Sequence, residues 1–374
     1  MQEKGRVSPG QVWLLIFGFM VGSAILLPNA PAAKRDAWLA VPLGEGLGIA
    51  MAFIYTGLLA RFPGKTLVEA ATCALGTWLG KFVGLLYFWF ALHLGSLVLR
   101  NSWEFLAATV LRQTPPPATA IALMLLVWYA TRGGVEVIAR TAQLLVPLVI
   151  IIPTLFIVAM PSHVDLRNLL PILENGWVPL LKGSLQTAAF PAGETILFTM
   201  ILPYMKPAGE ARRVTVSAIA ATAVLGTLVV GRDVAVLGSL REHLSYPAYD
   251  GVSMVTIANF VEGLEALLVA LWIVGTFTKI TVCHYAAALS LAQLTGLKDY
   301  RPLTGPLAAM ILALSFWVYP NAAAMNSFAA TTWVPYAFVF ELIIPLLLLI
   351  LTAIRGLGPR SKKRAARARN QLTS

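Results

Sequence analysis

Charged residues are scarce in this chain. Only 12% of its 374 residues are Asp, Glu, Lys or Arg, while 58% are hydrophobic. Because a soluble domain carries about 25% charged residues, this composition excludes an ordinary soluble protein. Apolar runs of about 20 residues, the length that crosses a bilayer as a helix, recur along the sequence. The runs are continuous rather than alternating, so the chain is expected to be a polytopic helical membrane protein and not a β-barrel.

Cysteines and catalytic motifs are also lacking. Cys73 and Cys283 are the only cysteines, too few for a disulfide framework, and both are interpreted as small apolar residues. The sequence contains no P-loop, HExxH, GxSxG or CxxC pattern. We therefore expect neither an enzyme nor ATP-driven transport, and no cofactor or metal.

Acidic residues are fewer than basic ones, 17 against 28, which gives a net charge of +11. This excess is not spread evenly, as nucleic-acid binding would favour, but is concentrated in a C-terminal tail. A basic tail directly after a membrane helix is typical of a cytoplasmic anchor on anionic lipid. The expected partner of this charge is therefore the lipid bilayer and not nucleic acid. The tail holds Arg355, Arg360, Lys362, Lys363, Arg364, Arg367 and Arg369.

The hydrophobic pattern predicts ten membrane spans. They cover residues 11–30, 39–60, 81–110, 118–131, 141–160, 183–204, 212–237, 255–294, 303–320 and 334–355. With a cytoplasmic N-terminus, nineteen basic residues fall on the inside and six on the outside, which places both termini in the cytoplasm.

Ten spans divide into two groups of five, and an odd number per group inserts the second group upside down relative to the first. Such inverted repeats are typical of secondary transporters. The expected organisation is a cytoplasmic N-terminus at 1–10, a first repeat at 11–160 and an extracytoplasmic connection at 161–182. A second repeat at 183–355 and a basic cytoplasmic tail at 356–374 follow.

The first span of each group contains helix-breaking residues. Gly22-Ser23-Ala24 lies near the middle of span one, and Pro191-Ala192-Gly193 interrupts span six. An opened helix exposes free N–H groups that suit a carboxylate and free carbonyls that suit an ammonium group. Two breaks in equivalent places therefore predict a midplane site for a small zwitterion such as an amino acid. Packing glycines and a simple proline kink are the alternative.

Ionisable residues within spans are functional candidates, because burying a charge in a membrane is costly. Glu194 follows the second break and is the preferred carboxylate. It could bind a ligand ammonium group, relay a proton, or only hold the break open with hydrogen bonds. Lys279, in span eight, could be a proton site or a substitute for a sodium ion, or it could snorkel to the inner surface. Glu45 and Glu341 lie in spans two and ten.

Two further charged pairs lie within spans. Arg100 and Glu104 are four residues apart in span three and are expected to form an ion pair on one helix face. Arg232 and Asp233 in span seven are adjacent, so their side chains are expected to point in different directions.

Together, several short motifs resemble those of the spore germination permeases. These are the B subunits of germinant receptors, which are related to the amino acid–polyamine–organocation transporters. The motifs are residues 22–28 followed by Asp36-Ala37-Trp38, the stretch GVEVIARTA at 134–142, Asp165 with Leu170-Pro171, and FPAGE at 190–194. The resemblance extends over about residues 8–355.

The resemblance implies an all-α membrane protein with ten transmembrane helices, a five-plus-five inverted repeat and discontinuous helices 1 and 6, as in the LeuT-like fold. It also implies a place in the spore inner membrane beside receptor A and C subunits. There the chain would recognise a germinant, often an amino acid, and signal to its partners. A proton- or sodium-coupled amino acid transporter is the alternative function.

Transferred to this sequence, the resemblance places the binding region at the two breaks, with weaker candidates on spans three and eight. Some proton-coupled relatives in the wider superfamily carry a lysine on span five, and residues 143–160 contain none, which leaves ion coupling open. The implied ligand-binding residues are Gly22, Ser23, Ala24, Ile25, Asn101, Phe190, Ala192, Gly193, Glu194 and Thr276.

Overall fold

A computed structural model describes residues 3, 5–24, 27–159, 164–253 and 264–358 of the chain. In these residues the fold is built from helices, with one isolated backbone bridge between Val7 and Met205. Ile25 of the predicted binding region and residues 359–374 of the basic tail lie outside the described part.

The first half of the chain contains the five predicted spans and one additional short helix, α3. Thr66 caps α3 by accepting a hydrogen bond from the Glu69 N–H, and the Glu69 side chain accepts one from the Thr66 N–H in return. This cap lies outside any apolar run, so hydrophobicity alone did not indicate the helix. The elements are α1 (Pro9–Ala24), η1 (Pro31–Asp36), α2 (Ala37–Arg61), α3 (Leu67–Leu75), α4 (Thr77–Ala108), α5 (Pro116–Gly133) and α6 (Val135–Ala159).

The second half begins earlier than expected, because α7 starts at Trp177 rather than at residue 183. Helix 6 of the fold consists of α7 (Trp177–Thr187), a π-helical turn η4 (Ala188–Ala192) and the 3-10 helices η5 (Gly193–Met200) and η6 (Leu202–Tyr204). Then follow α8 (Ala211–Leu237), η8 (Gly238–His243), α9 (Pro247–Ser253), α10 (Leu264–Thr295) and α11 (Arg301–Trp317). Two short 3-10 helices, η3 (Leu166–Leu169) and η7 (Ala208–Glu210), complete this half apart from helix 10.

The last span is one continuous helix whose geometry changes along its length, which the sequence did not indicate. It begins at Ala322, twelve residues before the predicted start at 334, and contains two π-helical turns. Its parts are α12 (Ala322–Ser327), η9 (Phe328–Thr332), α13 (Trp333–Phe338), η10 (Val339–Ile343) and α14 (Ile344–Ile354).

Among the described residues, six helical segments are long and apolar enough to cross a membrane. They are Pro31–Arg61, Thr77–Ala108, Val135–Thr154, Ala208–His243, Ala266–Thr295 and Ala322–Ile354. The other four predicted spans correspond to helices that are shorter or broken, namely α1, α5, α11 and helix 6. The ten-span interpretation therefore agrees with the fold.

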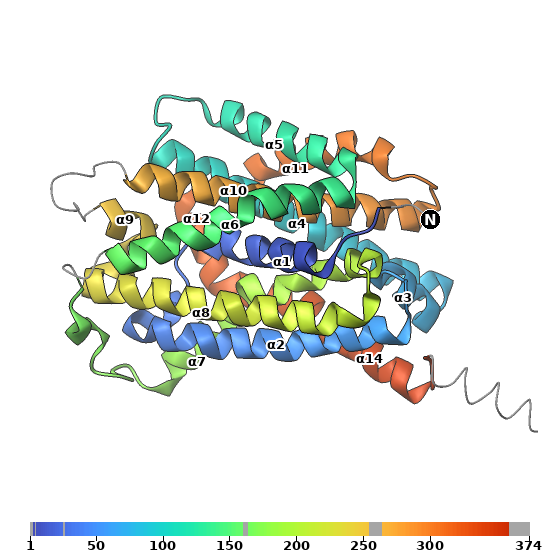
Figure 1. Ribbon diagram of the computed structural model, residues 1–374, viewed down its shortest axis with the longest axis horizontal. Coiled ribbons are helices and arrows are strands. Elements are labelled where there is room, and N and C mark those ends of the chain that lie inside the picture. The colour runs from blue at the N-terminus through green and yellow to red at the C-terminus, as the bar shows by residue number, and fades with distance from the viewer. Residues whose placement is uncertain (1–2, 4, 25–26, 160–163, 254–263, 359–374) are drawn as a thin grey trace, which may run out of the picture.

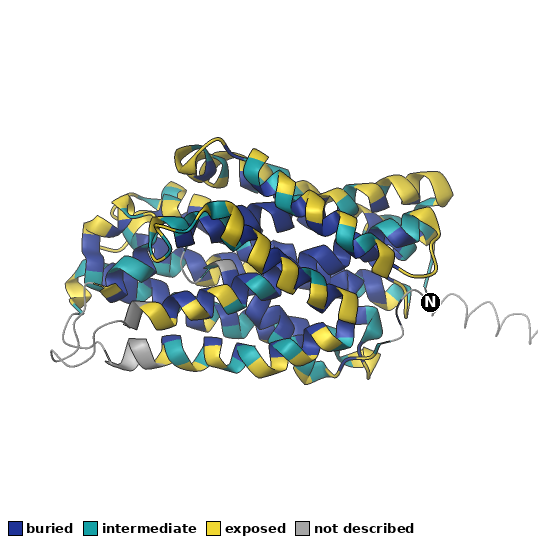
Figure 2. Ribbon diagram, turned by 90° about the horizontal axis from the view of Figure 1, so that it is seen from above, coloured by how far each residue is buried: buried dark blue, intermediate teal, exposed yellow. Residues whose placement is uncertain are grey.

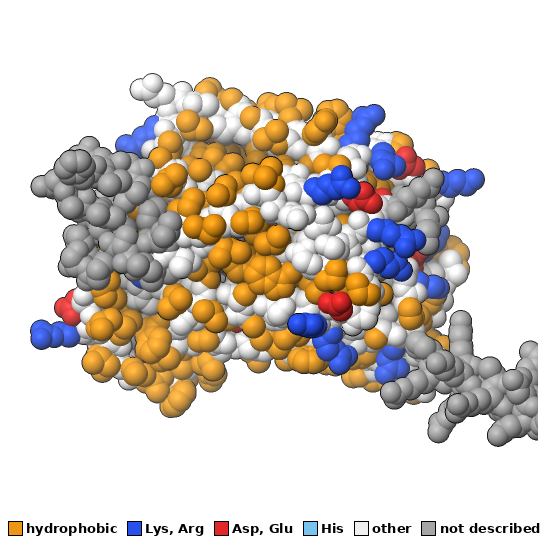
Figure 3. All heavy atoms as spheres, viewed as in Figure 1, with side chains coloured by type: hydrophobic (Ala, Val, Ile, Leu, Met, Phe, Trp, Pro, Cys, Tyr) orange, Lys and Arg blue, Asp and Glu red, His pale blue; other side chains and the backbone are white. Residues whose placement is uncertain are grey.

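The helices run roughly parallel to one long axis, with α1 in the interior and longer helices around it (Figure 1). Buried side chains fill the interior and exposed ones face outward along the outer helices (Figure 2). On the face seen in Figure 3, hydrophobic side chains cover the middle, and most Lys and Arg side chains gather at the end that carries the N-terminus. This distribution suits a body that sits in a bilayer with one basic end.

The chain preceding α1 is joined to the end of helix 6. The Val7 N–H donates to the Tyr204 carbonyl at 3.2 Å, and the Lys206 N–H donates to the Val7 carbonyl at 3.0 Å. The buried Glu3 carboxylate accepts from the Tyr300 hydroxyl at 3.1 Å and from the Val135 N–H at 3.2 Å. These contacts close the bundle at the end that carries the N-terminus.

Candidate functional site

Helix 1 breaks later than predicted. The helix α1 continues through Gly22 and Ser23 to Ala24, and the described residues 27–30 that follow are not helical. Gly22 instead packs against the backbone of Gly275 on α10, where a Cβ on either glycine would overlap the other residue's backbone. The expected opening at Gly22-Ser23 is therefore corrected, because Gly22 serves close helix packing.

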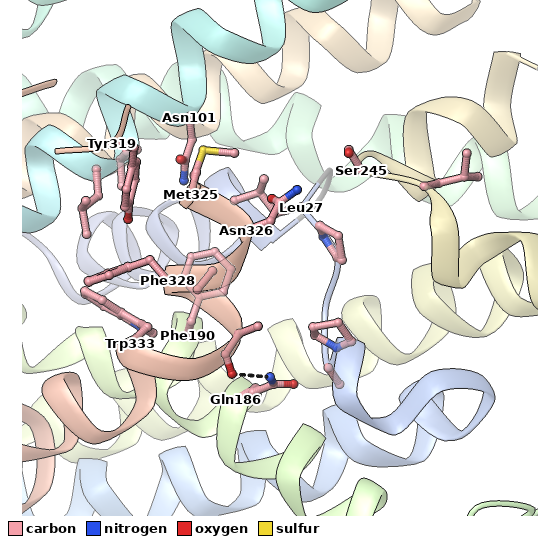
Figure 4. Close-up of a pocket in the computed structure, with 18 of the residues that line it drawn as sticks. Leu27, Asn101, Gln186, Phe190, Ser245, Tyr319, Met325, Asn326, Phe328 and Trp333 are labelled. Atoms are coloured by element: carbon pink, nitrogen blue, oxygen red, sulfur yellow. Dashed lines mark hydrogen bonds between the residues drawn. The ribbon is translucent and has the colours of Figure 1, made fainter. Parts of the chain in front are cut away.

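Helix 6 breaks where the sequence predicted. Phe190 has extended backbone angles (φ −142°, ψ 114°) within the π-helical turn that contains Pro191. Pro191 has no N–H to donate, and the distorted turn leaves part of the backbone outside the regular α-helical ladder. The ring of Phe190 projects into the interior from this point (Figure 4).

A cavity of about 340 Å³ lies between the helix 6 break and the chain that follows helix 1. Its size falls within the range of about 300–1,000 Å³ that small-molecule sites occupy. Three of the predicted residues, Asn101, Phe190 and Glu194, line it. The buried Asn101 Oδ1 has no hydrogen-bond partner among the described residues, which leaves it available to a ligand.

The other cavity walls come from elements that the sequence analysis did not single out. Residues 27, 28, 30 and 31 form one wall, α4 a second, and helix 10 a third. In Figure 4, Phe328 and Trp333 lie close to Phe190, while Met325 lies beside Asn101. The Gln186 amide N–H donates to the Ala330 carbonyl at 3.3 Å across helices 6 and 10.

Glu194 pairs with Lys279, which α10 supplies, and both side chains are fully buried. The Lys279 ammonium also lies 4.5 Å from the centroid of the Phe190 ring and 5.0 Å from that of Phe19. Lys279 therefore does not snorkel to a surface. The structure joins the two residues of the predicted proton or ion site into one ion pair at the helix 6 break.

The cavity also contains a cation that the sequence analysis counted only as an outside residue. Arg241 in η8 donates to the Asn29 carbonyl at 2.8 Å and to the Lys34 carbonyl at 3.3 Å. It thereby holds the chain that follows the helix 1 break.

A second cavity, of about 30 Å³, adjoins the two breaks. Ala24 of the predicted binding region lines it, together with Glu45 on α2 and Thr187 at the end of α7. The Glu45 Oε2 and the Thr187 hydroxyl are buried without hydrogen-bond partners among the described residues. This volume is sufficient for a water molecule, which needs about 10–15 Å³ on the same measure.

The remaining predicted residues lie away from the large cavity. Ala192 packs toward Gly48 on α2, and Gly193 lies against Glu341 of helix 10. The Thr276 hydroxyl donates within its own helix to the Trp272 carbonyl at 2.8 Å. The structure therefore brings only part of the predicted set together.

The two charged pairs within spans have different outcomes. The expected pair of Arg100 and Glu104 is confirmed, with 2.6 Å between Nε and the carboxylate. The expectation that Arg232 and Asp233 point apart is wrong, because the guanidinium bends back onto the neighbouring carboxylate, with Nε 3.0 Å from Oδ1. Within the described part of the chain this buried arginine pairs with Asp233, and breaking a buried pair is costly.

Sequence comparison places the chain among known proteins. A family model described as "Spore germination protein" matches residues 6–323. Spore germination protein KB of Bacillus subtilis (strain 168) is 30% identical, over 93% of this chain and 95% of that protein. Spore germination protein YndE of the same organism is 23% identical, over 82% of this chain and 86% of that protein.

Structure comparison shows the fold of LeuT-like transporters. Mhp1, a nucleobase-cation-symport-1 family transporter with bromovinylhydantoin bound, matches with a TM-score of 0.66 and 13% identity, over 90% of this chain and 78% of that chain. A Na⁺-coupled sialic acid symporter matches with a TM-score of 0.64 and 12% identity, over 91% of this chain and 80% of that chain. At these identities the likeness concerns the fold alone.

Proposed function

We propose a ligand-receptor function from the premise that this chain belongs to the spore germination protein family. It is a homologue of germinant receptor B-type subunits and has a transporter-like fold. In this proposal the large cavity binds a small germinant, and the chain passes the binding event to partner subunits. The role is recognition and not catalysis.

One observation carries the proposal, namely that the large cavity has both a carboxyl group and a guanidinium group in its lining. Glu194 lies at the helix 6 break, and Arg241 holds the segment after helix 1. An amino acid carries an ammonium and a carboxylate group that complement these two charges, and the aromatic and aliphatic lining suits its side chain. An amino acid is therefore the proposed ligand class.

Receptor A and C subunits are the proposed partners, and the spore inner membrane is the proposed location, with both termini in the cytoplasm. A ligand changes the signalling state only if it binds one conformation more tightly than another. The chain that follows helix 1, the broken helix 6 and helix 10 with its π-helical turns all contribute to the cavity. They are the proposed elements through which ligand binding biases that conformational equilibrium.

Glu194 and Lys279 are the proposed proton or ion site. The Lys279 ammonium supplies a positive charge inside the bundle, as a coupling cation would. In the receptor proposal this charge is permanent, so ligand binding needs no ion gradient. The alternative, a proton- or sodium-coupled amino acid transporter, would use the same cavity.

The test is a thermal-shift screen of the full chain, purified in detergent, against the common amino acids, sugars and nucleosides. A ligand that binds only the folded state raises the thermal midpoint. We expect one amino acid to raise the midpoint. In Asn101→Ala the same shift should require at least a tenfold higher ligand concentration. Gln143→Ala should leave the shift unchanged, since Gln143 is exposed on α6 away from the cavity.

Two further results would separate the alternatives. Gradient-driven uptake of the same amino acid by the chain in liposomes would favour the transporter over the receptor. If no compound stabilises the chain, the screen is repeated with the A and C subunits co-expressed. Absence of a shift there as well would contradict the proposed ligand class.

A further inference from the structure

A second buried carboxylate lies directly behind the cavity lining. Glu341 is in the π-helical turn η10 of helix 10, its side chain is fully buried, and neither carboxylate oxygen has a hydrogen-bond partner among the described residues. Its backbone, in contrast, is well bonded, because the Tyr55 hydroxyl lies 2.6 Å from the Glu341 carbonyl. The unusual turn therefore holds the carboxyl group inside the bundle.

This carboxyl group is close to the helix 6 break. A Cβ on Gly193 would overlap the Glu341 Oε2 and would lie 2.9 Å from the Ala188 carbonyl oxygen. Glu341 also interacts electrostatically with Glu194 and Lys279. The charged and titratable groups around Glu341 come from α2, α4, α10 and helix 6. They are Tyr55, Tyr87, Lys279 and Glu194.

The charges in this cluster do not balance. Two carboxyl groups, those of Glu194 and Glu341, face one ammonium group, that of Lys279, and all three side chains are fully buried. An uncompensated charge in the interior of a membrane protein is strongly unfavourable and is removed by binding a proton. Since Lys279 is already paired with Glu194, the proton belongs on Glu341.

The surroundings of Glu341 favour the same assignment. Its Oε2 and the Ala188 carbonyl oxygen both lie beside Gly193. The Ala188 carbonyl already accepts a hydrogen bond from the Gly193 N–H, and no donor among the described residues reaches the Glu341 carboxyl oxygens. A carboxyl group in such a place avoids the cost of a buried charge by binding a proton. We propose that Glu341 is a proton-binding site, and that Lys279 couples its occupancy to the Glu194 carboxylate in the cavity lining.

The coupling follows from one ammonium group serving two acids. While Glu341 holds its proton, Lys279 neutralises Glu194 alone. When the proton leaves, Lys279 is shared, so Glu194 attracts a ligand ammonium group more strongly. If the proposed amino-acid function is correct, the germinant therefore binds more tightly at higher pH and its binding releases the Glu341 proton, since such linkage is reciprocal.

The experiment needs no ligand, so its failure is distinct from failure of the proposed function. Infrared spectra of the full chain in lipid, recorded over a pH series, report the carbonyl stretch of buried carboxylic acids. We expect an acid band at neutral pH that Glu341→Gln removes. Glu45→Gln is the matched control, because Glu45 is a buried carboxyl group that faces the separate small cavity, and it should leave the Glu341 band in place.

Glu194→Gln tests the coupling. This substitution frees Lys279 to pair with Glu341, so the Glu341 acid band should disappear at a lower pH than in the unaltered chain. Glu45→Gln should leave the pH at which the band disappears unchanged. If Glu341→Gln does not fold, Glu341→Asp serves instead, since it keeps the proton but shifts the band frequency. If the spectrum at neutral pH shows an ionised carboxylate band that Glu341→Gln removes, the proton site is overturned. If the acid band of Glu341 disappears at the same pH in Glu194→Gln as in the unaltered chain, the coupling is overturned.

The thermal midpoint supplies a second readout. The folded chain holds this proton to a higher pH than the unfolded chain does. The midpoint should therefore fall as the pH rises above the range in which an exposed glutamate ionises, and should level off once the acid band has disappeared. Glu341→Gln should abolish this fall. A fall of equal size in Glu341→Gln would contradict the assignment.

Discussion

Gly22 lies where a side chain has no room. A Cβ at this position would overlap the backbone of Gly275, and the reverse holds for Gly275. We expect Gly22→Ala and Gly275→Ala each to lower the free energy of unfolding by about 1–3 kcal/mol, because overpacking forces α1 and α10 apart. The measurement is the thermal midpoint of each purified variant.

The matched control is Gly46 on α2, where a Cβ meets no atom within 4 Å. Gly46→Ala should leave the midpoint unchanged or raise it, since alanine favours a helix by up to about 1 kcal/mol over glycine. Equal changes of the midpoint in all three variants would indicate that helix propensity, and not the contact between α1 and α10, sets the stability effect.

The same residue shows why part of the site was mispredicted. A glycine in a membrane helix serves either an opening or a close approach of two helices, and the sequence around Gly22 is compatible with both. The deciding partner, Gly275, is more than 250 residues away along the chain. Glu194 was easier to identify, because an acidic residue next to a helix-breaking Pro-Ala-Gly tripeptide has few structural uses in a membrane span.

At the level of helices, Tyr55 of α2 connects two distorted segments. Its hydroxyl lies 3.1 Å from the Gly193 carbonyl at the helix 6 break and 2.6 Å from the Glu341 carbonyl in helix 10. Both carbonyls belong to turns that depart from regular α-helical geometry. Tyr55→Phe should therefore leave a buried acceptor unpaired and lower the stability by about 1–3 kcal/mol.

Thermal unfolding measures this effect as well, and Tyr129→Phe is its control, because the Tyr129 side chain on α5 is 76% exposed. A midpoint for Tyr55→Phe equal to that of Tyr129→Phe would show that other donors satisfy the two carbonyls.

The distortions of helices 6 and 10 differed in how far the sequence indicated them. Proline and glycine at 191 and 193 identified the break in helix 6, which the backbone angles of Phe190 confirm. Helix 10 was predicted as a plain span starting at 334, because its π-helical turns, Phe328–Thr332 and Val339–Ile343, contain neither residue. Such a turn depends on tertiary contacts, such as those of Tyr55, which a single sequence does not reveal.

At the level of the whole molecule, the orientation in the membrane is open to a direct test. Cys73 is exposed on α3, near the end that carries the N-terminus, and Ser245 is exposed where it lines the cavity. A membrane-impermeant maleimide should label native Cys73 in right-side-out vesicles only after they are permeabilised. Ser245→Cys in a Cys73→Ser background should be labelled in intact vesicles.

Labelling of Cys73 in intact vesicles would reverse the proposed orientation. Cys283 does not complicate the assay, because its side chain is fully buried in α10.

The overall fold was largely predictable, because hydrophobic length and basic-residue bias act over whole spans and tolerate errors at their ends. The cavity was less so, because its lining combines residues from six separate parts of the chain. Arg241 illustrates the difference, since in the sequence it is one of six basic residues that fall in outer segments. Only its hydrogen bonds to the carbonyls of Asn29 and Lys34 show that it fixes the chain after helix 1.

The contact between Val7 and the end of helix 6 has a genetic consequence. It consists of two backbone hydrogen bonds, from the Val7 N–H to Tyr204 and from the Lys206 N–H to Val7. Exchanging side chains leaves these donors in place, and only proline removes an N–H group. A mutant selection for chains that open at this end would therefore recover proline at position 7 or 206. An alanine scan would not test the contact, because Val7→Ala removes buried side-chain packing but leaves both hydrogen bonds in place.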